Sequence, residues 1–168
     1  MALLIIAVSM TTPLMARFFR GRALDSEARR LLALTRHGQS RAVSEGLPMD
    51  LWVDVERGSF GLEAEPSYQT TDPKKVEFQL DTGLQMEIVR SGVSAAAFPQ
   101  SQTRPASIAS VPKVLLVRAG LPTIRFLPDG SISETSPAML RLKGRDGESL
   151  YLAQSSTRLK YEIRRTDK

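Results

Sequence analysis

The segment Ala23–Asp54, ALDSEARRLLALTRHGQSRAVSEGLPMDLWVD, contains the change of hydrophobic period that decides the fold. In its first part, residues suited to a buried face recur every three or four positions, which predicts an α-helix with one packing stripe. The stripe consists of Leu24, Ala28, Leu31, Leu32, Thr35, Gln39, Ala42 and Val43. The remaining helix surface is predicted to carry Asp25, Arg29, Arg30, Arg36 and Arg41. Gly46, followed by Leu47 and Pro48, predicts the end of the helix.

After residue 48 the period changes to two, which indicates β-strands. Residues 49–55 predict a strand with one buried face, because Met49, Leu51, Val53 and Val55 alternate with Asp50, Trp52 and Asp54. Similar alternation predicts strands over 60–64, 76–80, 84–88, 114–117, 124–127, 140–142, 150–152 and 159–163. Turn residues predict three hairpins, which join 49–55 to 60–64, 76–80 to 84–88, and 140–142 to 150–152.

These patterns together predict one architecture. Residues 91–112 are rich in Ser, Ala, Gln and Pro without periodicity, so we expect a mobile exposed loop there. One long helix followed only by antiparallel strands is typical of the α+β class. We therefore expect a long, kinked N-terminal helix whose residues 23–46 pack on two small antiparallel sheets built from residues 48–164.

The amino-terminal residues differ from the rest of the chain. Residues 1–16, MALLIIAVSMTTPLMA, include twelve apolar side chains and no charge. Pro13 predicts a kink in this helix, and not its end. A bilayer-spanning helix needs about 20 apolar residues, slightly more than this run provides. Residues 1–22 are predicted to protrude from a globular part formed by 23–168, since the fold offers them no packing partner. The alternative is an ordinary helix buried in a soluble domain.

The composition argues against enzymatic chemistry. The chain has no cysteine, so it has no disulfide, thiolate metal site or cysteine nucleophile. Its only histidine, His37, cannot build a multi-histidine metal site. Ser40, His37 and Asp50 could be combined as a triad, but neither a nucleophile elbow nor a Gly-rich oxyanion loop accompanies them. We expect no enzyme, no metal and no cofactor.

Two further features have weak functional interpretations. The segment 126–131, FLPDGS, superficially resembles the start of a calcium loop but lacks the further acids, so a turn is expected. A formal net charge of +5 permits contact with nucleic acid without requiring it. Basic residues gather near the carboxyl terminus, where a charged, solvated strand edge is the simpler interpretation; they are Arg158, Lys160, Arg164, Arg165 and Lys168.

Two stretches resemble the GspH/FimT family of pseudopilins, found in type II secretion and type IV pilus systems. The first is residues 1–54, in which an apolar segment with an internal proline leads into an amphipathic helix, then Gly-Leu-Pro and a strand. The second is IRFLPDGSIS (124–133) followed by LRLKGRDGESLYLAQSSTRLKYEIRR (140–165), similar to the family's Phe-x-Pro-Asp-Gly turn and closing hairpins. Together they cover about half of the chain, and the segment between them matches in layout only.

The chain departs from the family pattern at two places. It has no basic leader, cleavage glycine or Phe-Thr-Leu-x-Glu start, and Ser155-Ser156-Thr157-Arg158 replaces the commoner Thr-Gly-Arg. If Pro13 corresponds to the family's helix proline, the resemblance implies that a leader and about two helical turns precede Met1. Such a leader would hold the amino terminus inside, although Arg17, Arg20 and Arg22 alone would favour the opposite orientation.

The resemblance implies a non-enzymatic fibre subunit with the pilin-like α+β fold. Its apolar helix would lie in the bacterial inner membrane as a single pass, with the C-terminal domain in the periplasm, before it packs against other minor and major pseudopilins. The contact residues would be Leu3, Leu4, Ile5, Ile6, Val8, Pro13 and Leu14. The function expected is that of a minor pseudopilin at or near the tip of a type II secretion pseudopilus. The alternative is a FimT-like minor pilin that binds DNA through the basic carboxyl-terminal residues.

Overall fold

The computed structural model describes residues 2–68, 71–89 and 120–165, with side chains from residue 22 onward. A single long helix, α1 (Ala2–Glu45), precedes the strands. The described strands are β1 (Met49–Asp54), β2 (Ser59–Ala64), β3 (Val76–Gln79), β4 (Gln85–Val89), β5 (Thr123–Phe126), β6 (Met139–Lys143), β7 (Ser149–Gln154) and β8 (Tyr161–Arg164).

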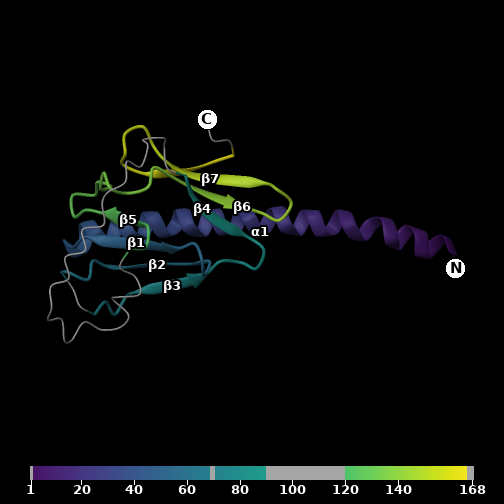
Figure 1. Cartoon of the computed structure of the whole chain (residues 1–168), viewed down its shortest axis with the longest axis horizontal. Helices are drawn as coiled ribbons and strands as arrows, with labels where there is room; N and C mark the ends of the chain where they lie inside the picture. Colours follow the sequence, from purple (N-terminus) through teal and green to yellow (C-terminus); the bar gives the residue numbers. More distant parts are fainter. Residues whose placement is uncertain (1, 69–70, 90–119, 166–168) are drawn as a thin grey trace, which may run out of the picture.

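The strands form two four-stranded antiparallel sheets. Sheet 1 has the order β3-β2-β1-β5 and sheet 2 the order β4-β6-β7-β8. The second half of α1 contacts strands of both sheets, and Figure 1 shows it running between them. The predicted α+β class, with a helix packed on two antiparallel sheets, is confirmed.

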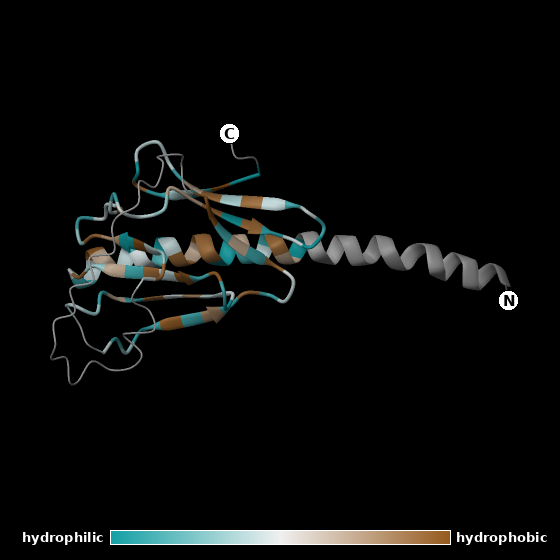
Figure 2. Ribbon diagram, in the orientation of Figure 1, coloured by the Kyte–Doolittle hydropathy of each residue, from teal (hydrophilic) through white to brown (hydrophobic). Residues whose placement is uncertain are grey.

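The predicted packing stripe of α1 is confirmed except at its carboxyl end. Five of its members are buried, namely Leu24, Ala28, Leu31, Thr35 and Ala42. Figure 2 shows hydrophobic residues along the described part of α1 and in the strands beside it. Val43 was predicted in the stripe but is 55% exposed, because it lies one position round the helix from Ala42, which is the residue that faces the core there. The helix continues through Pro13 as expected, and the kink stays a prediction.

Gly38, a buried glycine that was not among the predicted stripe residues, sets how closely sheet 1 approaches α1. A Cβ on Gly38 would lie 2.8 Å from Leu62 Cδ1 and 2.9 Å from Phe126 Cδ2. Leu62 and Phe126 are almost completely buried, so neither side chain has free space to retreat into. Gly38 therefore permits the close contact between the helix and strands β2 and β5.

The hairpin predicted from 76–80 and 84–88 is wrong. β3 pairs with β2 in sheet 1, whereas β4 pairs with β6 in sheet 2. The connection between them is a turn in which Leu84 N donates to Asp81 O at 3.1 Å and Gly83 has φ +102°. Alternation identified both strands and the turn, but it contains no information on which strand each one pairs with.

Other details of the strand predictions also need correction. Trp52 and Asp54 were placed on an exposed face of β1, but both are buried, and the indole of Trp52 lies against Gly61. Val55 and Leu159 were predicted to face the core; both lie beyond the ends of their strands and are 42% and 55% exposed. The predicted loop 91–112 and strand 114–117 lie outside the described residues.

Replacing Gly38 by Val should destabilise the fold by about 1–3 kcal/mol, because the added atoms overpack the contact with Leu62 and Phe126. Helix propensity favours valine slightly over glycine, so propensity cannot explain a loss. Denaturant unfolding, followed by fluorescence of the single tryptophan, Trp52, measures the effect. The matched control is Ser40→Val at an exposed position of the same helix; equal stability of the two variants would contradict the packing argument.

Candidate functional site

The predicted packing residues at the amino terminus lie on the first part of α1, and their side chains fall outside the described residues. The set is Leu3, Leu4, Ile5, Ile6, Val8, Pro13 and Leu14. With 44 residues, α1 is about 66 Å long, and Figure 1 shows its amino-terminal part projecting past both sheets. Within the residues that the structure describes, no helical segment is both long and apolar enough to cross a membrane.

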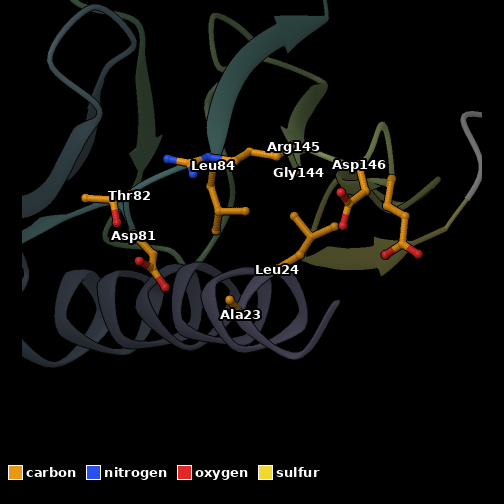
Figure 3. A pocket seen from close by; sticks show the side chains of 10 residues that line it. Ala23, Leu24, Asp81, Thr82, Leu84, Gly144, Arg145 and Asp146 are labelled. Carbon is orange, nitrogen blue, oxygen red and sulfur yellow. The ribbon is translucent and has the colours of Figure 1, made fainter. Parts of the chain in front are cut away.

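Where α1 enters the globular part, two turns at one end of sheet 2 border a small pocket, the turn before β4 and the β6–β7 turn (Figure 3). Leu24 of α1 and Leu84 of the turn before β4 point toward each other across it. Gly83 lies beneath the Arg145 guanidinium, which leaves no room for a Cβ there. The pocket encloses about 80 Å³. Sites for organic ligands usually enclose about 300–1,000 Å³, so this pocket is a packing junction and not a cofactor site.

The residues considered for a triad do not come together. His37 and Ser40 are exposed on α1. Asp50 lies on the face of β1 that points away from α1, since Met49 and Leu51 face the core. Its carboxylate pairs with Arg125, whose Nε lies 3.2 Å from Oδ1. Burial raises the pKa of Asp50, and the Arg125 guanidinium opposes that shift.

No group of three or more potential metal ligands gathers within the described residues. In the 126–131 segment, Asp129 Oδ1 instead accepts hydrogen bonds from Ser131 N at 2.8 Å and Ser131 Oγ at 2.7 Å. These bonds lower the pKa of Asp129. Gly130 has φ +82°, as the turn requires. The turn prediction for this segment is confirmed.

Gln39, which sequence periodicity placed in the apolar stripe, joins the helix to both sheets. Its Nε2 donates to the Leu159 carbonyl at 2.7 Å and to the Gly130 carbonyl. The first carbonyl lies in the turn before β8, and the second lies in the turn after β5. One amide therefore holds two turns from different sheets against the same face of α1.

The basic carboxyl-terminal residues do not form one uniform patch. Arg158 lies 3.7 Å from Glu134, and Lys160 lies 3.0 Å from Glu162, whose pKa it lowers by hydrogen bonding. Arg164 and Arg165 form no ion pair within the described residues. Lys168 lies outside those residues. The acid at position 162 thus divides the basic strand.

An ion cluster that sequence reasoning missed lies at the carboxyl end of α1. Arg41 was predicted on the helix surface, but only 6% of its side chain is exposed. Its Nη2 lies 3.0 and 3.1 Å from the two carboxylate oxygens of Asp72, and its Nε lies 3.1 Å from Glu45 Oε1. Arg41 also donates to the Lys74 carbonyl, and the Lys74 ammonium pairs with Glu45 at 2.9 Å. The spacing offered a signal: Arg41 follows Gly38 by three residues, so it falls beside the buried stripe.

Asp72 links this cluster to sheet 1. Its Oδ2 accepts from Ala64 N at 2.8 Å and its Oδ1 from Lys74 N at 2.9 Å. Burial alone would raise the pKa of Asp72, but the hydrogen bonds from Arg41, Ala64 and Lys74 outweigh it, so the pKa is lowered. The cluster thereby ties the connection between β2 and β3 to the end of α1.

The helix and the two sheets together define an α+β fold in which one long helix packs on two antiparallel sheets. No family model and no curated protein matches the chain. Two solved structures are similar to it. The minor pseudopilin EpsH from the Type 2 Secretion System of Vibrio cholerae aligns at 12% identity and a TM-score of 0.48, over 89% of this chain and 98% of that chain. A crystal structure of EpsH from the same bacterium aligns at 15% identity and 0.43, over 86% and 91%. Neither likeness assigns a role to a residue of this chain.

Replacing Arg41 by Met should destabilise the protein by about 3–5 kcal/mol at neutral pH, because it leaves the buried Asp72 carboxylate without its charged partner. The pKa of Asp72 is lower in the folded protein than in the unfolded chain. Its carboxylate therefore contributes fully to the free energy of unfolding above about pH 4, and this contribution is lost as pH falls through the folded pKa. The stability difference between the two proteins should therefore shrink on acidification. Denaturant unfolding at several pH values measures it, with Arg29→Met as the exposed control; a difference independent of pH would contradict the assignment.

Proposed function

We propose that this protein is a structural fibre subunit, a minor pseudopilin of the GspH/FimT type in a type II secretion system. It would lie at or near the tip of the pseudopilus. The observation that carries the proposal is that α1 is embedded between two sheets along its second half, whereas its first half, which is apolar in sequence, projects past them. The sequence resemblance over residues 1–54, 124–133 and 140–165 supports the same function.

The mechanism we propose is assembly through the helix. Residues 1–22 would anchor the subunit in the bacterial inner membrane, with residues 23–168 in the periplasm. An uncharged helix satisfies its own backbone hydrogen bonds, so it can leave lipid for a bundle of similar helices without exposing polar groups to hydrocarbon. The residues proposed to pack against other minor and major pseudopilins are Leu3, Leu4, Ile5, Ile6, Val8, Pro13 and Leu14.

A buried charge in the projecting segment should block assembly. We expect Leu4→Asp or Ile5→Asp to abolish incorporation into the fibre, because a carboxylate at a helix contact would be desolvated without a partner. Recovery of the subunit in purified fibres measures incorporation, and Trp52 fluorescence verifies that the sheets still fold. Ser156→Asp, at an exposed turn, is the matched control. Normal incorporation of both helix variants would contradict the proposal.

The second candidate function is DNA binding by a FimT-like minor pilin. It is favoured by Arg164 and Arg165, adjacent basic residues that form no ion pair within the described part of the chain. Arg158, Lys160 and Lys168 would add further phosphate contacts. Neutralising phosphates releases counterions, so such binding would weaken steeply with salt.

The DNA alternative predicts a gel shift of the protein with duplex DNA at low salt. Changing Arg164 and Arg165 together to Ala should then weaken binding. It should also lower the slope of log binding constant against log salt concentration by about one to two, because about that many fewer counterions are released. Arg29→Ala, which removes an exposed arginine paired with Asp25 on α1, is the control and should leave binding unchanged. Absence of binding at low salt would eliminate this function.

A further inference from the structure

Sheet 2 has two edges that can accept a further strand. In its order β4-β6-β7-β8, β4 and β8 are the outer strands, and no strand within the described residues pairs with their outer edges. The outer edge of a strand presents N–H and C=O groups that are not used in the sheet. Pairing with a strand of another chain is a common way to satisfy them.

A backbone hydrogen bond between β7 and β8 determines which residues of β8 face its open edge. Ser155 N donates to the Lys160 carbonyl at 2.8 Å, at the start of the β7–β8 ladder. Backbone groups of an antiparallel strand alternate between its two neighbours. Those of Glu162 and Arg164 therefore point toward β7, and those of Tyr161 and Ile163 point toward the open edge.

The same reasoning applies to β4. Gly144 N donates to the Glu148 carbonyl at 2.8 Å, which directs the backbone of Leu142 toward β7 and that of Arg141 toward β4. Arg141 is opposite Glu87, so the backbone groups of Met86 and Ile88 face the open edge of β4.

The two edges match in their side chains. Met86, Ile88, Tyr161 and Ile163 all belong to the core or pack against it, so the residues that offer edge hydrogen bonds carry apolar side chains on the core face. On the outer face, β4 carries Glu87, which also lies 3.5 Å from Arg141 of β6. On the same face, β8 carries Arg164 beside Glu162, which pairs with Lys160. A β8 strand paired with a β4 strand would therefore place apolar residues together on one face and opposite charges on the other.

Beside β4 there is an open groove with a surplus of acidic side chains, which suits a strand that carries basic residues. The groove has a volume of about 510 Å³ and is bordered by the β1–β2 turn and by residues 79–84. Its lining includes the exposed Val55 and three acids, Glu56, Asp81 and Glu87, against one base, Arg57. The β8 end of the sheet has the opposite balance, because Lys160, Arg164 and Arg165 surround Glu162.

We propose that β8 of one copy of this protein adds to β4 of a second copy as an antiparallel strand. The register places Ile163 opposite Ile88 and Arg164 opposite Glu87. A shift by two residues would instead place Glu162 opposite Glu87, two like charges that destabilise a pair. In the proposed register Arg164 and Glu87 form a pair without backbone hydrogen bonds between them, the kind in which side chains are closest.

This contact keeps neighbouring copies in the same orientation. β4 and β8 are antiparallel within one sheet, so an antiparallel β8–β4 contact between copies makes their α1 helices parallel. Each copy offers both edges, so the contact does not close and can continue from copy to copy. A pairing of four or five residues is small, so the association is weak and depends on high local concentration. The inference does not rest on the proposed secretion role.

Site-directed disulfide formation tests the contact directly, because the chain has no cysteine. Full-length Glu87→Cys and Arg164→Cys proteins are mixed in detergent micelles and oxidised gently. We expect a dimer linked between the two different chains, since the Cα atoms of such a pair lie about 4.5–5.5 Å apart, within disulfide range. A chain that carries both cysteines should give a ladder of larger products. Absence of the mixed dimer would overturn the proposal.

Two further pairs of cysteine variants separate the proposed contact from other associations. Lys143→Cys, on the inner strand β6, mixed with Arg164→Cys should give little product; an equal yield would mean random collision and overturn the proposal. Glu162→Cys mixed with Arg164→Cys probes a two-fold contact between two β8 strands. A higher yield from that pair than from Glu87→Cys with Arg164→Cys would also overturn it.

Charge reversal gives a test without cysteine. Glu87→Arg alone and Arg164→Glu alone should each weaken self-association by about two- to fivefold in sedimentation experiments, because like charges become opposite one another. A mixture of the two variants restores one complementary contact and should associate more strongly than either variant alone. A mixture that associates no better would contradict the register. Unfolding monitored at Trp52 checks that both variants keep the fold.

Discussion

The second half of α1 has to bury its surface against two sheets at the same time, and this requirement shapes the whole globular part. A helix between two sheets can keep both close only where its side chains are small. Gly38 is positioned against Leu62 and Phe126 of sheet 1, while Ala28 and Ala42 are almost completely buried. Larger side chains, such as Leu24 and Leu31, fill the wider spaces. Because packed interiors have few voids, the sheets cannot shift independently of the helix.

Polar side chains near the carboxyl end of α1 bind the turns and the connection that hydrophobic packing does not fix in place. Gln39 binds a turn from each sheet, and Arg41 binds Asp72 in the connection between β2 and β3. Buried charges are tolerated only when paired, and the Arg41–Asp72 pair attaches the β2–β3 connection to the end of α1. The stability of this end of the domain therefore depends on the pairing of its buried charges. The stability around the middle of the packed helix depends on how closely the side chains of helix and sheets fit together.

The arrangement suits a protein that works by association. The proposed packing against other subunits uses the projecting part of α1. The proposed β8–β4 contact between copies uses the edges of sheet 2. The two are compatible, because a β8–β4 contact leaves the helices of neighbouring copies parallel.

The sequence by itself determined the local elements and the fold class. The 3.6-residue period of 24–42 and the alternation after residue 48 correctly identified the helix, most strands and the α+β class, because each pattern reflects one element with one buried face. It also correctly identified the turns at 81–83 and 126–131, where Asp and Gly supply the local bonds and the backbone conformation. Only the tertiary structure decided which strands pair. Residues 76–80 and 84–88 look like a hairpin but belong to different sheets, since alternation carries no information on partners. The burial of Arg41 was likewise decided by Asp72, which reaches it only once the β2–β3 connection lies against α1. The burial of Trp52 was decided by Gly61, whose missing side chain leaves room for the indole on the opposite strand of the hairpin.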